Sequence, residues 1–394
     1  MIGDSGRVGA FLAAVFAAAA ILSAYLPLWL ADHGVASAQI GLVLGVASLL
    51  RVVFVPACGW ATDRLGRHRA ALGLASALAA LCLAGLPAAH GAIGIAALVV
   101  LGGIAASALP AITDALTIAL AAAGRLEYGP TRAWGSVAYM LATAGAGFLL
   151  GRFGSALVPW LLGGGYGAAA LLAILLPSGP AAPYALAPAA PCALAPAAPC
   201  ALAPAAPARL GPDFRRALLA TMLIQGSHAA YYAFASLHWR QAGIADGTIG
   251  LLIGEGIIAE IGLFLWGRGL VERLGPSRLT ALAACACLLR WSVLAATVSV
   301  PILAAVQLLH AATFACQHLS TMIVLRAIPP SRAAFSQTAM AAIGFSAPTG
   351  VLTWLSGQLY GALGGLVFLL MAAIGGAALL VAPSLPGGAR HRSA

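Results

Sequence analysis

The chain has 394 residues, of which 62% are hydrophobic and only 8% are charged, and its mean hydropathy is +1.00. Soluble domains carry about a quarter charged residues, so this composition excludes a soluble fold and indicates an integral membrane protein. The net charge of +10 comes from Arg without any basic stripe or aromatic-basic module, which excludes a nucleic-acid-binding protein.

Apolar segments separated by charges and Pro/Gly clusters follow one another along the chain. Each is close to or above the ~20 residues that a spanning helix needs, and none shows the alternation of a barrel strand. The first segment lacks a small-residue cleavage site, so we expect a retained helix and not a signal peptide. The sequence predicts an all-α membrane protein with twelve transmembrane helices, at about 8–30, 38–60, 70–88, 93–121, 133–151, 156–176, 215–239, 247–267, 278–298, 301–323, 334–357 and 360–382.

The Arg residues gather in alternate loops. With the N-terminus in the cytoplasm, sixteen of the 20 lie on the cytoplasmic side, and only Arg152 and Arg240 lie outside. Because cytoplasmic loops of membrane proteins are enriched in positive residues, we expect both termini in the cytoplasm. The expected location is the bacterial cytoplasmic (inner) membrane.

A Pro/Ala-rich tract lies between the sixth and seventh segments. The octad ALAPAAPC is written twice and then begun a third time. Pro at this density prevents a helix and favours an extended, semi-rigid chain, so we interpret the tract as a linker. The predicted domains are an N-terminal six-helix bundle (1–176), a cytoplasmic linker (177–214) and a C-terminal six-helix bundle with a short cytoplasmic tail (215–394).

The two predicted bundles are related by an offset of 209 residues. HGVASAQIGLVLG (33–45) aligns with AGIADGTIGLLIG (242–254), and the same offset aligns DRLG (63–66) with ERLG (272–275). One register that matches at two separated places indicates a duplicated unit. A duplication of this kind predicts two pseudo-symmetric bundles around a central cavity.

The segment after the second helix, GWATDRLGRHR (59–69), resembles the loop signature of the major facilitator superfamily. The resemblance implies twelve helices in two bundles and alternating access. Three further stretches (113–139, 223–239 and 288–320) look like the phenylpropionate permease family of proton-coupled symporters, although Pro130 stands where that family suggests a basic residue. The residues expected in the gating loop and its partner are Gly59, Asp63, Arg64, Gly66, Arg67, Arg69 and Arg132.

Ionisable residues inside a bilayer are costly and mark transport pathways by default. We expect Glu260 and Arg290 to form the proton-coupling pair, although a structural bridge between two helices remains an alternative. Asp114 and His318 complete the proton-coupling set, and Asp114 either contacts substrate or pairs with Arg132 as a gate. Acid, Arg and His on consecutive helices resemble the lactose permease.

The candidate substrate-binding residues are polar or aromatic and lie within predicted helices. One group forms a stripe along the seventh helix, another shares a face of the tenth helix with Phe314, and packing is the alternative for both. Arg51 corresponds to Glu260 in the repeat and either pairs with it in one state or finds partners within its own bundle. The candidates are Gln225, His228, Tyr231, Tyr232, Trp291, His310, Gln317, Trp29 and Arg51.

The resemblance to the phenylpropionate permease family implies proton-coupled symport of a small aromatic or other organic acid. A symporter for nucleosides or sugars, or a drug exporter, is the alternative with the same fold. No catalytic triad, nucleotide loop or metal-ligand spacing is present in the sequence, so we expect no enzyme activity, cofactor or metal. The expected partners are a small-molecule substrate, a proton and the lipid bilayer, and the expected state is a monomer.

Overall fold

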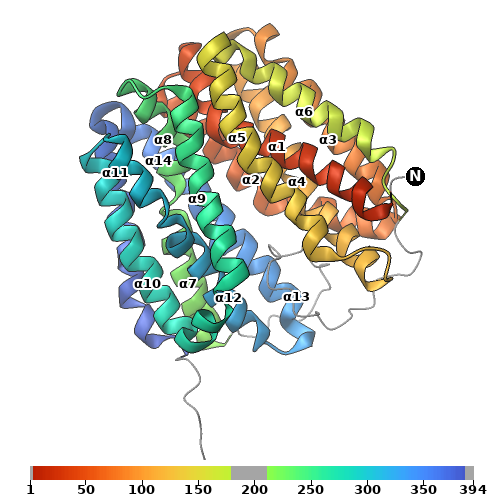
Figure 1. The fold of residues 1–394 in the computed structure, drawn as a ribbon, viewed down its shortest axis with the longest axis vertical. Helices are drawn as coiled ribbons and strands as arrows, with labels where there is room; N and C mark the ends of the chain where they lie inside the picture. The colour runs from red at the N-terminus through yellow and green to blue at the C-terminus, as the bar shows by residue number, and fades with distance from the viewer. Residues whose placement is uncertain (1–2, 179–210, 387–394) are drawn as a thin grey trace, which may run out of the picture. The chain divides into compact units, whose positions relative to one another are not determined.

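The computed structural model describes residues 3–178 and 211–386, so the octad repeats lie outside the described residues. Helices are the regular elements in these two stretches (Figure 1). The contacts divide the chain into two compact units. The first consists of Met1–Val35, Val46–Leu202 and Ala245–Leu251, and the second of Ala36–Gly45, Ala203–Ile244 and Leu252–Ala394.

Helix α1 is the central element of the first unit. It packs against α5 and α6, while α3 packs against α4 and α6. Large α1 side chains such as Phe11 and Trp29 are fully buried, and the Tyr25 hydroxyl donates a 2.7 Å hydrogen bond to the carbonyl oxygen of Thr143 on α5. The helices run α1 (Asp4–Asp32), α2 (Ser37–Leu65), α3 (His68–Ala84), α4 (Gly91–Ala122), α5 (Tyr128–Phe153) and α6 (Val158–Ala173).

The second unit is built around α10 and α7. Helix α10 packs against α15 and α12, helix α7 packs against α12 and α15, and α14 packs against α8. Two π-helical turns interrupt this unit, η3 (Ala311–Cys316) and η4 (Met340–Ser346). The α-helices are α7 (Pro212–Gly226), α8 (Ala229–Gln241), α9 (Asp246–Trp266), α10 (Arg268–Ala296), α11 (Val300–Gln307), α12 (Gln317–Arg326), α13 (Pro330–Ala339), α14 (Ala347–Leu363) and α15 (Val367–Gly376).

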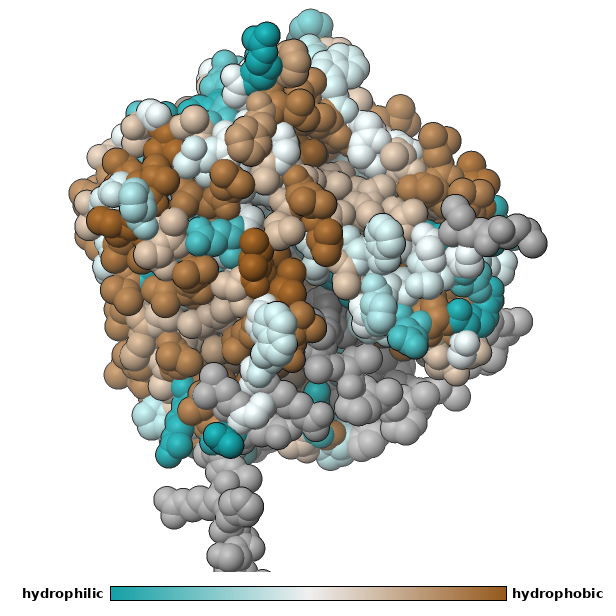
Figure 2. Space-filling model, viewed as in Figure 1, coloured by the Kyte–Doolittle hydropathy of each residue, from teal (hydrophilic) through white to brown (hydrophobic). Residues whose placement is uncertain are grey.

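Within the described stretches, nine runs are long and apolar enough to cross a membrane. The other predicted segments differ for local reasons. Helix α3 is shorter, with 17 residues, the segment at 215–239 is broken into α7 and α8, and the last two segments count as the single run Phe335–Ser384. Brown, hydrophobic side chains cover much of the visible face in Figure 2, as a bilayer requires. The count of twelve crossings stays a prediction.

The sequence repeat has a counterpart in the backbone. Gly34 and Gly243, which the 209-residue offset aligns, both adopt positive φ angles of 77° and 85° at the ends of α1 and α8. Gly66 and Gly275 also match, with φ angles of 63° and 65°. Because side chains other than Gly rarely tolerate this region, the repeated glycines mark repeated turns.

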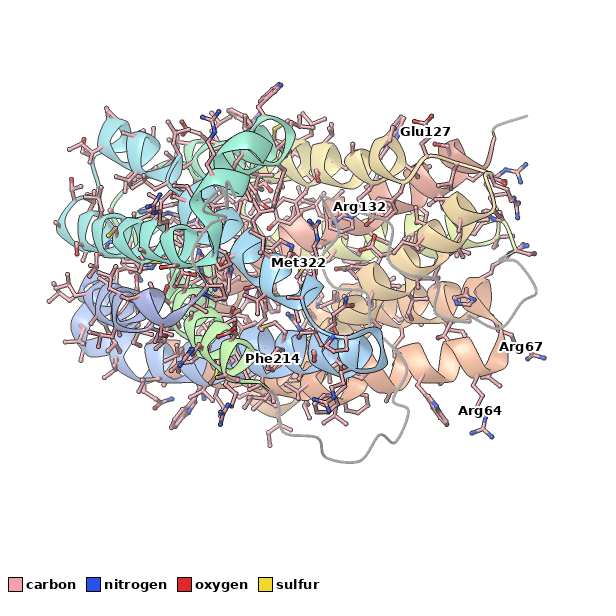
Figure 3. All side chains as sticks on the ribbon, turned by 90° about the horizontal axis from the view of Figure 1, so that it is seen from below. Arg64, Arg67, Glu127, Arg132, Phe214 and Met322 are labelled. Carbon is pink, nitrogen blue, oxygen red and sulfur yellow. The ribbon has the colours of Figure 1, made fainter. Side chains whose placement is uncertain are left out.

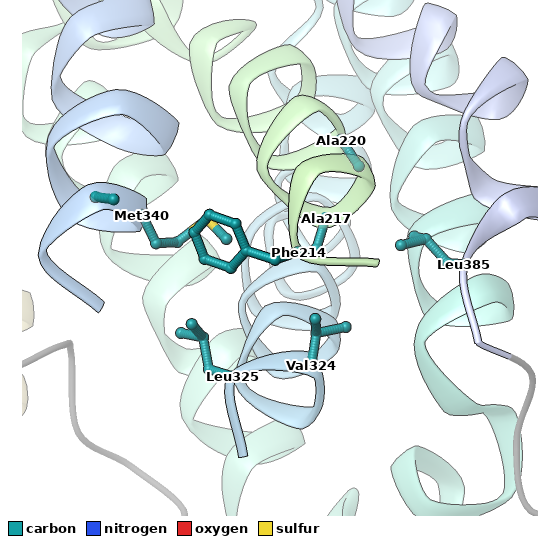
Figure 4. Close-up of a cluster of buried hydrophobic side chains, with 8 residues drawn as sticks. Phe214, Ala217, Ala220, Val324, Leu325, Met340 and Leu385 are labelled. Atoms are coloured by element: carbon teal, nitrogen blue, oxygen red, sulfur yellow. The ribbon is translucent and has the colours of Figure 1, made fainter. Parts of the chain in front are cut away.

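An apolar cluster in the second unit packs around the start of α7. The Phe214 ring at the start of α7 lies among side chains from α12, η4 and the end of the described chain (Figure 4). All members are at least nine-tenths buried. This cluster joins elements distant in sequence, and its members are Phe214, Ala217, Ala220, Val324, Leu325, Ala339, Met340 and Leu385.

We predict that Gly163→Ala destabilises the first unit, whereas Gly164→Ala does not. A Cβ on Gly163 would lie 2.6 Å from the Cβ of Ala84 on α3, whereas a Cβ on Gly164 meets nothing within 4 Å. Overpacking costs about 1–3 kcal/mol, while Ala in place of Gly gains up to about 1 kcal/mol of helix propensity at either position. Thermal unfolding in detergent measures the difference, and equal melting temperatures for the two variants would contradict this packing.

Candidate functional site

Arg290 on α10 is fully buried in the second unit, at 0% exposure. Its NH1 donates to His310 Nδ1 at 3.0 Å and to Thr313 Oγ1 at 3.1 Å, and its NH2 donates to Gln307 Oε1 at 2.8 Å. An ion removed from water costs several kcal/mol, which these three bonds to oriented acceptors offset in part. The sequence predicted this guanidinium as a functional group, and the structure gives it a shell of neutral acceptors.

Two aromatic rings cover the guanidinium. The Arg290 Cζ lies 4.6 Å from the Tyr231 ring centroid and 4.7 Å from that of Trp291, both within cation–π range. Gln307 Nε2 donates to the Tyr231 hydroxyl at 2.7 Å, and Trp291 Nε1 donates to Ser227 Oγ at 3.0 Å. Tyr231 and Trp291, predicted to line the substrate route, therefore enclose Arg290 in this structure.

His310 contacts both members of the predicted proton-coupling pair. Its Nδ1 accepts from Arg290, and its Nε2 lies 3.4 Å from Glu260 Oε2 on α9. Gly256 lets α9 approach the segment between α11 and η3 that carries His310, because a Cβ on Gly256 would lie 3.1 Å from the His310 Cβ. The structure therefore places His310, predicted as a substrate-binding residue, between Glu260 and Arg290.

Thr313 in the π-helix η3 connects Arg290 to His228. Its hydroxyl accepts from Arg290 and lies 3.1 Å from His228 Nε2. His228 Nδ1 lies 2.9 Å from the carbonyl oxygen of Ile224, an obligatory acceptor, so Nδ1 carries the proton of this ring. In the neutral ring Nε2 is then an acceptor, and the donor within reach is the Thr313 hydroxyl, which also lies 3.3 Å from the carbonyl oxygen of His310.

The stripe predicted along one continuous seventh helix is interrupted. Helix α7 ends at Gly226 and α8 begins at Ala229, because Ser227 Oγ and His228 Nδ1 both bond the Ile224 carbonyl and the His228 N–H bonds Gln225 instead. Gln225, His228 and Tyr231 are buried, whereas Tyr232 is 37% exposed. The break turns His228 toward Thr313 and Ser227 toward Trp291.

The predicted face of His310, Phe314 and Gln317 also differs from the structure. The rings of His310, Phe314 and His318 stack in one column, with interplanar angles of 19° and 2°. Gln317 instead donates to Thr221 Oγ1 at 3.1 Å inside the unit. Gln317 does not join this column, because the i→i+5 turn of η3 changes which residues share a face from those that α-helical spacing gives.

Asp114 forms an ion pair in the first unit. Its Oδ1 lies 3.4 Å from Arg132 Nε, which links α4 to α5, and the Arg132 guanidinium covers the Phe16 ring at 4.2 Å. The pairing with Arg132, one of the two predicted alternatives, is the one that this conformation contains.

The remaining predicted residues belong to the first unit. Trp29 is buried and stacks on His33 with centroids 4.0 Å apart, and Arg51 Nε is buried without a hydrogen-bond partner among the described residues. Arg64 lies over the Trp60 ring at 5.2 Å. Figure 3 shows Arg64 and Arg67 projecting away from the helices. The rest of the loop set comprises Gly59, which is buried, Gly66 and Arg69, which are exposed, and Asp63, whose side chain is not described.

Three residues of the cluster were not selected from the sequence as site residues. Gln307 and Thr313 bond Arg290, and Phe314 stacks on His310. Gln307 and Thr313 stand three residues before and after His310, a spacing that could have pointed to them. Among the described residues, no group of three or more His, Cys, Asp and Glu could hold a metal ion.

We predict that Arg290→Lys lowers stability although it keeps the charge. An ammonium group cannot bond His310, Thr313 and Gln307 with the fork of a guanidinium, and each lost bond to a charged group costs about 1.5–3 kcal/mol. Thermal unfolding in detergent should show a lower melting temperature. Arg278→Lys, an exposed position on the same helix, is the matched control, and an equal loss in both variants would contradict the proposed shell.

Comparison with known proteins identifies the family. A model of the "MFS_1 like family" matches residues 7–371. A probable 3-phenylpropionic acid transporter of Escherichia coli (strain K12) is 29% identical over 279 residues, which cover 71% of each chain.

Solved structures share the fold. The nucleoside transporter NupG has a TM-score of 0.75 at 16% identity and covers 97% of this chain and 99% of its own. The inward-open xylose transporter XylE from E. coli has a TM-score of 0.70 at 12% identity, with 98% and 96% covered. These matches confirm the predicted fold, and the match to a family of transporters agrees with the expectation that the chain is not an enzyme. The chain belongs to the MFS_1 like family, and it is a multi-pass transporter of the major facilitator superfamily.

Proposed function

We propose that the protein carries a small aromatic or other organic acid together with a proton across the bacterial inner membrane by alternating access. The similarity to a probable 3-phenylpropionic acid transporter of E. coli supports an aromatic acid such as 3-phenylpropionate. The observation that carries the proposal is the series Glu260–His310–Arg290, in which Arg290 and His310 are buried and the Glu260 side chain is 18% exposed. We further propose that both termini lie in the cytoplasm, based on the placement of Arg in the loops, and the monomer stays a prediction.

The charges in this series explain how a proton and an anion would bind together. Arg290 is a fixed positive charge, and the ionised Glu260 offsets it through His310. A proton on Glu260 leaves the cluster one charge more positive in a region of low dielectric. An incoming carboxylate restores the balance, so proton and anion favour each other's binding.

The aromatic part of the cargo has its own candidate surface. Arg290 is enclosed and its NH1 and NH2 groups are already bonded, so we do not assign it a direct contact with cargo in this conformation. Tyr232 is the exposed ring of the cluster, and it stacks on His228 with centroids 5.7 Å apart. Phe314, which also contacts His228, is partly exposed. We assign Tyr232 and Phe314 to the slot for an apolar ring.

We predict that Glu260→Gln abolishes accumulation driven by a proton gradient but preserves exchange of labelled for unlabelled cargo. Gln keeps the size and the hydrogen-bonding capacity of the side chain but cannot be protonated. The measurement is uptake into proteoliposomes under an imposed pH gradient, with protein-free liposomes to subtract passive entry of the weak acid. Glu255→Gln, five residues earlier on α9 and therefore on a different side of the helix, is the control and should accumulate cargo normally. Accumulation by the Glu260→Gln variant would remove Glu260 as the proton site.

Counterflow tests the class of cargo. Proteoliposomes preloaded with 3-phenylpropionate should take up labelled 3-phenylpropionate, and unlabelled aromatic carboxylates should compete with it. The neutral 3-phenylpropionamide should compete poorly, because it cannot balance the charge of Arg290. Inhibition by nucleosides or sugars, without inhibition by aromatic carboxylates, would favour the alternative cargo.

A further inference from the structure

The hydrogen-bond donors around His310 determine where its proton lies. A guanidinium can only donate, so the Nδ1 that lies 3.0 Å from Arg290 NH1 must accept and carries no proton. A neutral imidazole has one N–H, which is therefore on Nε2. That nitrogen faces Glu260 Oε2 at 3.4 Å and can donate to a carboxylate oxygen or to the carbonyl oxygen of a protonated carboxyl group.

A second proton on His310 has no acceptor. It would go on Nδ1, where it would point at the Arg290 N–H and place one cation against another. The charged or titratable groups that face His310 in the described contacts are Glu260 on α9, Arg290 on α10 and the ring of His228, whose centroid is 5.9 Å away. His228 already uses both ring nitrogens, toward Ile224 and Thr313. Among these groups, the Glu260 carboxylate is the one that the proposed function protonates.

The surroundings hold the His310 ring in one orientation. The ring stacks on Phe314 with centroids 5.5 Å apart, and Gly256 packs against its Cβ. The residue is 8% exposed. A ring flip would place carbon atoms opposite Arg290 and Glu260 and would leave the guanidinium NH1 with one acceptor fewer.

We propose that His310 is a positioning residue that stays neutral with its proton on Nε2, fixes the Glu260 carboxyl group relative to Arg290, and does not itself carry the transported proton. This inference rests on the proposed function, because it concerns the route of the coupled proton. It differs from the expectation that a buried His beside an acid shares the proton transfer. The two histidines of the cluster are then neutral with opposite tautomers.

The test replaces His310 by a side chain that has its hydrogen bonds but not its basicity. In His310→Gln, the amide offers one acceptor to Arg290 and one donor to Glu260, but it cannot be protonated. We expect gradient-driven accumulation in proteoliposomes within about threefold of the unchanged protein. His310→Leu offers neither group, and we expect accumulation to fall about ten- to a hundredfold, as for the loss of a hydrogen bond to a charged group. The pH at half-maximal uptake should move in the Leu variant and stay in place in the Gln variant.

The outcomes separate this inference from the proposed function. If His310→Gln loses accumulation but keeps exchange, as expected for Glu260→Gln, then His310 carries the proton and the inference is wrong while symport stands. If the unchanged protein shows no gradient-driven uptake, the proposed function fails first. Nitrogen-15 NMR of the histidine-labelled protein, with the His310→Gln spectrum for assignment, reads the tautomer independently. Protonation of both His310 nitrogens within the pH range of transport would overturn the inference, whatever the variants transport.

Discussion

The enclosure of one guanidinium in an apolar bundle constrains the whole second unit. Arg290 is fully buried, and its acceptors come from Gln307 at the end of α11, His310 beside it and Thr313 in η3. Buried ions are tolerated only when oriented groups replace water. The helices that supply these groups must therefore keep their relative positions and rotations. Two irregular turns next to the cluster, the break between α7 and α8 and the π-helical turn η3, help to meet that requirement.

Those irregular turns are the part of the fold that the sequence did not predict. Hydropathy detects a long apolar segment, and it identified most of the membrane-crossing runs in the described residues. The break at Ser227 and His228 arises because both side chains bond the carbonyl of Ile224. The π-helical turn at Ala311–Cys316 contains no Pro or Gly from which it could be predicted. Such features depend on side-chain bonds inside the folded unit, which hydropathy and helical spacing do not contain.

The predicted duplication has a counterpart in the backbone, because glycine at a turn can be recognised in the sequence. Gly34 and Gly243 adopt similar positive φ angles, and so do Gly66 and Gly275. The aligned glycines therefore have the same backbone conformation in both units. The site shows the opposite case. Tyr231 and Trp291 were expected to meet substrate, but an aromatic ring in a membrane helix can equally cover a cation, and only distances distinguish these roles. The sequence predicted that ionisable residues gather in this unit, but not which of them contact each other in the series Glu260–His310–Arg290.

That order has a thermodynamic consequence for the proposed transport cycle. If an anion raises the proton affinity of Glu260, the proton must raise the affinity for the anion by the same factor, because the two binding free energies are linked. A cargo without charge would gain nothing from the additional positive charge, so the proposed coupling would operate for carboxylates and not for sugars or nucleosides. A neutral His310 strengthens this argument. With its second nitrogen committed to Arg290, the charge of the cluster depends on Glu260 and on the cargo, and proton and anion are then coupled through a single site.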